Sequence, residues 1–383
     1  MKKILIFLGT RPEIIKLAPL IDSIKRKKTN IDIEFEVCFT GQHIEMASHI
    51  IEFFNIKPNY NLSLMEQNQD LNKLSGKLFI SVDEVLERAD PDLVIVQGDT
   101  TSAMISALAS FHRKIKIAHI EAGLRSFNKL APFPEEINRT IISRVADFNF
   151  VPTERAKENL LKENIDSSTI WVVGNTVVDA MLLTLQIIEK DSDLKRKIVE
   201  FFNERGILLN GQNETRIITV TMHRREHFGE KLENMCKAIQ ILAKEFRDII
   251  FVFPVHLNPN VKKIVYSILQ GVRNIILLEP LPYPYFIYLL SKSFLVLTDS
   301  GGIQEEAPSF NVPVLVLRDV TERIEGIEVG VSKLIGTQTY QIVYESARII
   351  KDRTEYEKMQ KGENPYGDGK ASDRIVDVLL KYI

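Results

Sequence analysis

The sequence predicts an α/β protein built from two doubly wound, Rossmann-like domains. Short runs of β-branched and aliphatic residues alternate with longer amphipathic stretches, a pattern typical of parallel βαβ units. The runs form two series, one in each half of the 383-residue chain. Several runs stop at loops that carry acidic, basic or glycine residues, and parallel sheets bind ligands at the carboxyl ends of their strands. We therefore expect an enzyme whose active site lies in a central cleft between the two domains.

The first domain is expected to span residues 1–172. Its strands are predicted at residues 4–8, 35–39, 93–97, 115–120 and 148–151. Amphipathic helical segments separate these strands, among them residues 19–27 and 45–54. A last helix at residues 371–380 follows a glycine-rich hinge at 361–369, and we expect residues 367–383 to pack back on this domain.

The second domain is expected to span residues 173–366 and to carry the second series of strands. This series is predicted to begin at residues 170–173 and to continue at residues 217–221, 249–253, 275–278, 294–297 and 314–317. Because helical stretches alternate with these strands, the sheet should again be parallel.

The composition is that of an ordinary globular protein, with 45% hydrophobic and 26% charged residues. A net charge of −2 gives no electrostatic reason to expect nucleic acid or an anionic membrane as a partner. Cys38 and Cys236 lie far apart without metal-type spacing, so we expect buried free thiols in a reducing compartment. The chain starts directly with a strand, and its most apolar stretch, residues 286–297, is interrupted by Lys292. These features predict a cytoplasmic protein without a membrane span.

Two loops have the composition of phosphate-binding turns. Gly9 to Glu13 follow a strand and open a helix, where Arg11 would meet an anion at the positive helix end. Ser300, Gly301 and Gly302 also lie between a strand and a helical stretch, and two glycines let consecutive amides cradle a phosphate. The alternatives are an ordinary βα turn with a surface arginine and a plain glycine turn. The sequence contains no G-x-G-x-x-G fingerprint, so we expect no tightly held nicotinamide cofactor.

Three carboxylates are candidates for acid–base chemistry. Asp99 and Glu121 follow neighbouring predicted strands, and Glu135 lies in a proline-rich loop that could reach the same site. Carboxylates forced together repel each other, so at least one should have a raised pKa and act as an acid or base near neutral pH. Helix capping and simple surface exposure are the alternatives for any one of them.

The segment His223 to His227 matches the H-x-x-E-H pattern of one group of metalloproteases. That chemistry needs both histidines on one helix face, whereas this segment follows a strand, contains two arginines and continues into a Phe-Gly pair typical of a loop. We therefore predict no metal site. His223 is better suited to an anionic substrate, as a proton donor or as a hydrogen-bond donor to a diphosphate.

At these residues the sequence resembles the non-hydrolysing UDP-N-acetylglucosamine 2-epimerases. The resemblance runs in order over essentially the whole chain and rests on GTRPEIIKLAP (9–19), GDTTSA (98–103), HIEAGLRS (119–126), PFPEEINR (132–139), GNTVVDA (174–180), HRRE (223–226), PVHLNPNV (254–261), DSGGIQEEAPS (299–309) and NPYGDGKAS (364–372). It implies the two-domain GT-B fold of glycosyltransferases, an isomerase that needs no cofactor, a UDP-sugar as substrate, and a homodimer.

The resemblance also implies roles for individual residues. Phosphates or nearby hydroxyls would be held by Arg11, Lys16, Ser300, Gly301, Gly302 and Arg323, and the ribose by Glu306. The catalytic group would be Asp99, Glu121, Glu135 and His223. Because C2 of the sugar has no neighbouring carbonyl, its epimerisation would proceed by elimination of UDP, formation of a 2-acetamidoglucal and re-addition of UDP. Which carboxylate acts on which face stays open.

Some positions depart from the family pattern. Leu281 stands where many relatives have glutamine near the uracil, although Phe286 matches, and Ile324 replaces a common proline. Uracil recognition would then rest on the backbone of a loop at 281–286, and the sugar could be a related UDP-N-acetylated sugar. A second, activating UDP-sugar site of some relatives would involve Gln42, Gln69, Arg224 and His256, although Glu45 and Asn68 depart from one regulated form. A GT-B glycosyltransferase and a catalytically inactive nucleotide-sugar sensor are the alternative functions.

Overall fold

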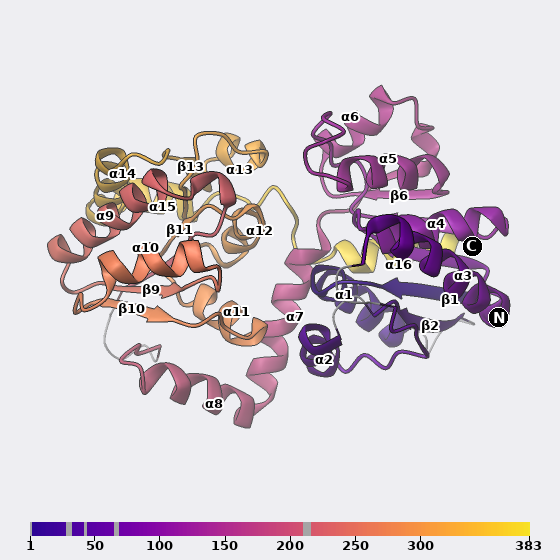
Figure 1. Cartoon of the computed structure of the whole chain (residues 1–383), viewed down its shortest axis with the longest axis horizontal. Helices are drawn as coiled ribbons and strands as arrows, with labels where there is room; N and C mark the ends of the chain where they lie inside the picture. Colours follow the sequence, from indigo (N-terminus) through magenta and orange to yellow (C-terminus); the bar gives the residue numbers. More distant parts are fainter. Residues whose placement is uncertain (1, 28–32, 42–43, 65–68, 210–215) are drawn as a thin grey trace. The chain divides into compact units, whose positions relative to one another are not determined.

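The computed structural model describes residues 2–27, 33–41, 44–64, 69–209 and 216–383. The chain forms two compact units (Figure 1). Unit 1 comprises the chain up to Ala180 together with Gly367–Ile383, and unit 2 comprises Met181–Tyr366. The division falls inside helix α7 (Thr176–Lys190). Each unit contains one parallel sheet flanked by helices, so the predicted α/β fold class with two doubly wound sheets is confirmed.

The sheet of unit 1 has the strand order of a Rossmann fold. Its strands are β1 (Lys2–Leu8), β2 (Ile33–Phe39), β3 (Tyr60–Asn61), β4 (Leu93–Gln97), β5 (Lys116–Ile120), β6 (Phe148–Val151) and β7 (Ile170–Val172). All neighbours pair in parallel in the order β3-β2-β1-β4-β5-β6-β7. The winding therefore reverses between β1 and β4, and such a switch point is where open α/β sheets bind ligands.

The helices of unit 1 cover both faces of this sheet. They are α1 (Arg11–Lys27), α2 (Ile44–Phe53), α3 (Leu71–Ala89), α4 (Thr101–His112), α5 (Glu135–Val145), α6 (Glu154–Lys162), the start of α7, and α16 (Ala371–Tyr382). The apolar faces of α3 and α4 pack with β1 and β4 into one cluster of buried side chains. Burial of such faces supplies most of the stability of short helices.

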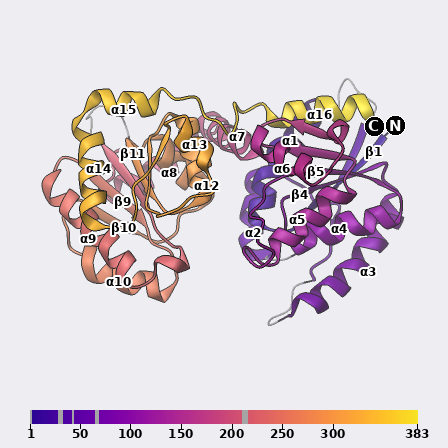
Figure 2. The same cartoon turned by 90° about the horizontal axis from the view of Figure 1, so that it is seen from above.

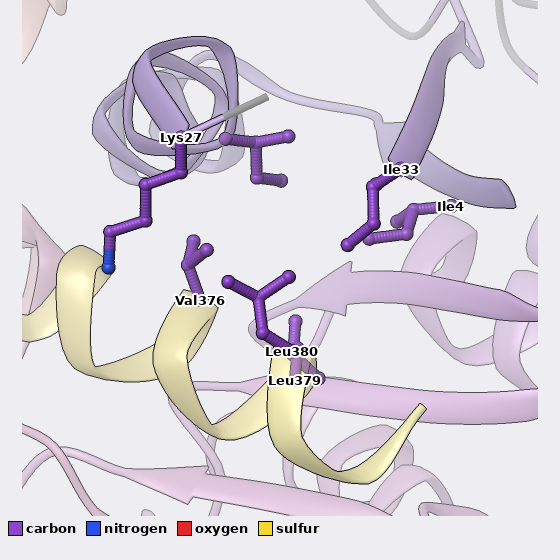
Figure 3. Close-up of a pocket in the computed structure, with 7 residues that line it drawn as sticks. Ile4, Lys27, Ile33, Val376, Leu379 and Leu380 are labelled. Atoms are coloured by element: carbon purple, nitrogen blue, oxygen red, sulfur yellow. The ribbon is translucent and has the colours of Figure 1, made fainter. Parts of the chain in front are cut away.

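The C-terminal helix α16 packs against α1. Asp373 accepts hydrogen bonds from Ser23 and Arg26, and Asp377 forms an ion pair with Lys27. Between the two helices and the start of β1 lies an apolar gap lined by side chains such as Val376 (Figure 3). Its volume of about 10 Å³ is of the order of one water molecule, so it is a packing defect and not a ligand site.

Unit 2 repeats the same winding. Its strands are β8 (Ile217–Thr221), β9 (Ile250–Pro254), β10 (Ile275–Leu278), β11 (Leu295–Thr298), β12 (Val314–Val316) and β13 (Ser332–Leu334). They pair in parallel in the order β10-β9-β8-β11-β12-β13. The switch point of this sheet therefore lies between β8 and β11.

The helices of unit 2 also form two layers. They are the rest of α7, α8 (Ser192–Asn203), α9 (Glu230–Glu245), α10 (Pro259–Leu269), α11 (Tyr283–Ser291), α12 (Gly301–Glu306), α13 (Ile324–Glu328), α14 (Thr339–Lys351) and α15 (Arg353–Gln360). Figure 2 shows α9, α10 and α14 together on one side of this unit, where their side chains belong to one buried cluster. Side chains of α8 and α11 belong to a different cluster, which also includes Val252 of β9.

Some predictions about elements were wrong or incomplete. Residues 170–172 do not open the second series, because β7 pairs with β6 as the last strand of the first sheet. The first helix begins at Arg11, as the turn at residues 9–13 predicted, and runs through Pro19, so the amphipathic segment 19–27 is its second half. The short edge strands β3 and β13 were missed, since two or three residues give no periodic signal.

Two further expectations concern the thiols and membrane crossing. Cys38 and Cys236 are free and buried, as predicted, and burial raises the pKa of each thiol to about 12. Among the described residues, no helix combines the length and the apolar character that crossing a bilayer requires.

Candidate active site

Several of the predicted catalytic and phosphate-binding residues follow the strands that flank the two switch points. In unit 1, Thr10 and Arg11 follow β1, and Gly98 and Asp99 follow β4. In unit 2, His223 follows β8, and Ser300 follows β11. The topology of each unit thus places these groups at the sheet edge where ligands bind.

Asp99 is held by two residues of α5. Arg139 forms an ion pair with its carboxylate, and the side-chain amide of Asn138 donates to its backbone carbonyl at 2.9 Å. Burial raises the pKa of Asp99, and the charge of Glu121 adds to this effect, while Arg139 and Lys16 oppose it. The raised pKa expected for this set of carboxylates is therefore seen at Asp99, but burial is its main cause and repulsion is secondary.

Glu121 follows β5 in an unusual backbone conformation. Its φ of 67° lies in the left-handed region, which non-glycine residues adopt mainly where their surroundings impose it. The carboxylate forms an ion pair with Lys16 of α1, and only 11% of its side chain is exposed. Lys16, which was predicted to hold phosphates, thus pairs with a predicted catalytic acid.

Glu135 is the first residue of α5 and is half-buried. Residues three and four positions apart share a helix face, so Glu135 lies on the face that also presents Asn138 and Arg139. The next residue, Glu136, is buried and accepts hydrogen bonds from the backbone amides of Ser126 at 3.0 Å and Phe127 at 2.8 Å. This carboxylate fixes the loop before α5 and is a structural neighbour of the predicted acid.

Glu13 is a buried acid that was not predicted from the sequence. Its carboxylate accepts hydrogen bonds from the amide of Thr10 at 2.5 Å and from the hydroxyl of Thr100 at 3.0 Å. It thus links the turn after β1 with the first residue before α4. Burial raises its pKa to about 7. The spacing Thr10-x-x-Glu13 is a capping-box signal at the start of α1 and could have revealed it. Arg11 is half-buried at the first position of this helix.

In unit 2 the fully buried Asp299 organises the turn after β8. Its carboxylate accepts hydrogen bonds from the amides of His223 and Arg224, both at 2.9 Å, and contacts His227 Nδ1 at 3.1 Å and His223 Nδ1 at 3.2 Å. Burial opposes ionisation, yet these donors outweigh it and hold the pKa of Asp299 far below its ordinary value. The position of Asp299 at a strand end did not indicate this role.

The glycine turn after β11 lies beside an arginine. A methyl group added at Gly301 would lie 3.3 Å from Cζ of Arg323, so the guanidinium is close to the backbone of this turn. Arg323 donates to Glu305 at 2.8 Å and forms an ion pair with Glu322 at 3.0 Å. Burial would raise the pKa of Glu322, but the charges of Arg323 and Arg318 lower it to about 2. A positive group is thus fixed next to the predicted phosphate turn.

The predicted nucleoside contacts lie on two helices that follow strands. Glu306 is the last residue of α12, one turn after Gly302. Phe286 belongs to α11, which begins at Tyr283, so the expected loop at 281–286 is wrong. The backbone amide of Phe286 donates to Pro282 within this helix, and Leu281 is buried in the core. Proline in the first turn favours helix over loop here.

Two of the predicted activator residues adjoin the predicted catalytic histidine. The rings of His223 and His256 stack with centroids 5.8 Å apart. The guanidinium of Arg224 donates to the backbone carbonyl of Asp299 at 2.9 Å. Gln69 lies before α3 in unit 1, whereas Gln42 lies outside the described residues.

The described side chains give no support for a metal site. Among them, no group of three or more His, Cys, Asp or Glu side chains is arranged to hold an ion. Residues 225–227 form a single 3-10 turn, so His223 and His227 do not share an α-helical face. His227 is buried against Asp299, and Glu226 pairs with Arg224.

The two wound sheets, with acids at one switch point and a glycine turn and arginine at the other, define an α/β enzyme of the GT-B-like fold class. The family model described as UDP-N-acetylglucosamine 2-epimerase matches residues 25–380. The chain belongs to this family.

Relatives and solved structures agree with this assignment. A UDP-N-acetylglucosamine 2-epimerase of Campylobacter jejuni is 48% identical over 381 residues, which cover 99% of this chain and 98% of the relative. The structure of UDP-GlcNAc 2-epimerase from Neisseria meningitidis bound to UDP-GlcNAc is 44% identical, with a TM-score of 0.87 and complete coverage of both chains. The enzyme from Methanocaldococcus jannaschii in complex with UDP-GlcNAc and UDP is 35% identical, with a TM-score of 0.79 and 99% coverage of both chains.

Proposed function

We propose that this protein interconverts UDP-N-acetylglucosamine and UDP-N-acetylmannosamine by inverting C2 of the sugar. The observation that carries the proposal is the group of charges at the switch point of unit 1. There Asp99, which is partly shielded from solvent and has a raised pKa, interacts electrostatically with Glu121. Each of these two carboxylates is also paired with a cation. The names of relatives at up to 48% identity supply the substrate.

The reaction needs no redox cofactor if it proceeds by elimination. A carboxylate removes the proton from C2, the electron pair of that C–H bond forms a C1=C2 double bond, and the C1–O bond to UDP breaks. The products of this half-reaction are 2-acetamidoglucal and UDP. In the second half-reaction a UDP oxygen re-forms the C1–O bond, and a proton is added to the opposite face of C2. Atoms and charge balance without an oxidant.

The two faces of C2 require two proton-transfer groups with different environments. Asp99 is half-buried and its pKa is raised, mainly by burial, which favours its protonated form relative to an ordinary aspartate, whereas Glu121 is paired with Lys16. Glu135 is the third member of this group, on the helix face shared with Arg139. We leave open which of the three acts on which face. Lys16 and Arg139 would limit the repulsion between these acids as protons move.

The departing diphosphate requires fixed positive charge and backbone donors. In unit 2 the guanidinium of Arg323 lies beside Gly301, in the turn that runs from Ser300 to Gly302. His223, whose backbone and ring are both held by Asp299, would donate to the diphosphate or its leaving oxygen. Arg11 would add charge from the start of α1, Glu306 would bind the ribose, and Phe286 would contact the uracil. Preorganised donors of this kind stabilise developing negative charge.

Purified protein incubated with UDP-N-acetylglucosamine alone tests the proposal. The expected result is a proton NMR spectrum in which the anomeric signal of UDP-N-acetylmannosamine grows to an equilibrium that is also reached from the other side. Failure to form this product without an acceptor, together with sugar transfer when acceptors are added, would instead show a glycosyltransferase. Parallel incubation with UDP-N-acetylgalactosamine tests a related sugar as substrate, and binding without any turnover would indicate a sensor.

Two properties of the family extend the proposal. Because Arg224 and His256 adjoin His223, a second UDP-sugar bound there would act directly on a catalytic residue. Substrate activation then predicts a sigmoidal rate curve with UDP-N-acetylmannosamine alone, and a strictly hyperbolic curve contradicts it.

A cytoplasmic homodimer is the proposed form of the enzyme. Size-exclusion chromatography with light scattering would test whether it is a dimer.

A further inference from the structure

Unit 2 contains a hollow at the edge of its sheet opposite to its own predicted phosphate-binding turns. It has a volume of about 660 Å³ and is lined by the first residue of β9, Ile250, and by Ile276 of β10. The active-site turns follow the other ends of the strands, after Thr221 and Thr298. A five-residue strand spans roughly 15 Å, so the hollow and the active-site turns lie on opposite edges of one sheet.

The charged side chains that line this hollow are all cationic. They are Arg205, Lys244, Arg247 and Arg273, and the described lining contains no carboxylate. Within the part of the chain that the structure describes, Lys244, Arg247 and Arg273 form no ion pair, whereas Arg205 contacts Glu204 at 3.6 Å. This concentration of unneutralised charge contrasts with the rest of the described surface, where most arginines and lysines are paired.

The acidic residues next in sequence are engaged with other cations. Glu245 pairs with Lys351 at 2.6 Å, and Asp248 pairs with Arg216 at 2.8 Å. In the segment from 244 to 248, both acids are thus paired with cations outside the segment. Its two cations, Lys244 and Arg247, have no acidic partner among the described residues and line the hollow. Cations near a helix C-terminus also interact favourably with its dipole, and this accounts for Lys244 but not for Arg205 or Arg273.

A side-chain amide fixes the backbone that carries these cations. Asn274 donates to the carbonyls of Ala243 at 3.0 Å, Phe246 at 3.0 Å and Ile249 at 2.8 Å. These bonds occupy backbone acceptors at the end of α9 and just before β9. Because the same amide joins the end of α9 to the start of β10, Arg247 and Arg273 are carried by backbone segments tied to each other. The site is thus preorganised for an anion.

We propose that this hollow binds a phosphorylated small molecule, or a phosphorylated headgroup, that carries two or more negative charges. Four cations match several phosphate oxygens, and arginine is suited to bind them in pairs. The volume is that of a small-molecule site, whereas nucleic acid is bound along extended basic stripes. The ligand is distinct from the UDP-sugar because the active-site turns lie at the other edge of the sheet.

Hydrogen–deuterium exchange of the full-length protein tests this site with inorganic pyrophosphate as the probe. Saturating UDP is present throughout, so that the expected nucleotide site is occupied. Pyrophosphate should slow exchange in peptides covering 243–250 and 271–276. The variant Arg247→Gln/Arg273→Gln should bind at least about ten-fold more weakly. The control Lys358→Gln/Lys361→Gln removes two exposed charges at the C-terminal end of α15 in the same unit and should bind like wild type.

The outcomes separate the possible sources of the ligand. Sedimentation with vesicles of phosphatidic acid, but not of phosphatidylcholine, would identify a headgroup, whereas protection by pyrophosphate without vesicle binding would identify a soluble ligand. Weaker protection in about 0.5 M salt is expected for either source. Absence of both protection and vesicle binding in the wild type, or equal binding by the Arg247→Gln/Arg273→Gln variant and the wild type, would overturn the proposal.

Discussion

Replacing Asp299 by asparagine should destabilise unit 2 and misplace His223. The buried carboxylate accepts from the amides of His223 and Arg224 and contacts the Nδ1 atoms of His223 and His227. An amide of the same shape keeps one acceptor oxygen and turns an NH₂ group towards the remaining donors. At least two hydrogen bonds to a charged group are therefore lost, each contributing about 1.5 kcal/mol or more.

The expected loss for Asp299→Asn is about 3 kcal/mol of the free energy of unfolding, or roughly 6–12 °C in Tm for a unit of this size. Urea denaturation followed by circular dichroism at pH 7 measures it. The control is Asp319→Asn, in which an exposed carboxylate loses its ion pair with Lys231, and it should change stability by less than about 0.5 kcal/mol. Because the folded pKa of Asp299 is depressed, its stabilisation is present above its ordinary value of 3.8 and is lost as the pH falls further. A variant as stable as wild type at pH 7 would refute this reasoning.

Three further predictions concern the acids and the packing of unit 1. Asp99→Asn, Glu121→Gln and Glu135→Gln should each lower kcat by on the order of 10² or more in the NMR assay, and near-normal turnover of all three would remove the catalytic assignment. Glu13→Gln should gain stability relative to wild type as the pH rises from about 5 to about 8. The reason is that the folded pKa of Glu13, raised to about 7, makes the wild type lose stability over this range. A difference in the free energy of urea unfolding between variant and wild type that is the same at both pH values would contradict it. Gly123→Ala should lower the free energy of unfolding by about 2 kcal/mol or more, because its Cβ would lie 2.3 Å from the carbonyl oxygen of Ala156 at a φ of 83°. The control Gly76→Ala, on the open face of α3, should stabilise the protein slightly. Equal melting temperatures for the two variants would argue against this prediction.

The sequence predicted the central strands well because they are buried on both faces. Residues 93–97 and 217–221 are runs of mainly aliphatic and β-branched residues, and they coincide with β4 and β8. The edge strands β3 and β13 have no such runs. Residues 170–172 were assigned to the wrong series, because a local pattern does not reveal which sheet accepts an edge strand.

The candidate site was predictable where it depends on topology and not where it depends on side-chain partners. Asp99 and Glu121 end adjacent strands, so their proximity follows from the parallel order. That Arg139 neutralises Asp99 depends on how α5 is rotated, although its position four residues after Glu135 was a usable signal. The role of Asp299 depends on two backbone amides contributed by a distant turn, and no sequence pattern encodes them.

The most direct test of the proposed mechanism is the fate of the C2 hydrogen. We predict that wild-type protein in deuterated water converts UDP-N-acetylglucosamine into UDP-N-acetylmannosamine that carries deuterium at C2, with traces of free UDP and 2-acetamidoglucal, and that the carboxylate variants form it far more slowly. Product that retains the original C2 hydrogen in full would contradict proton removal by these carboxylates.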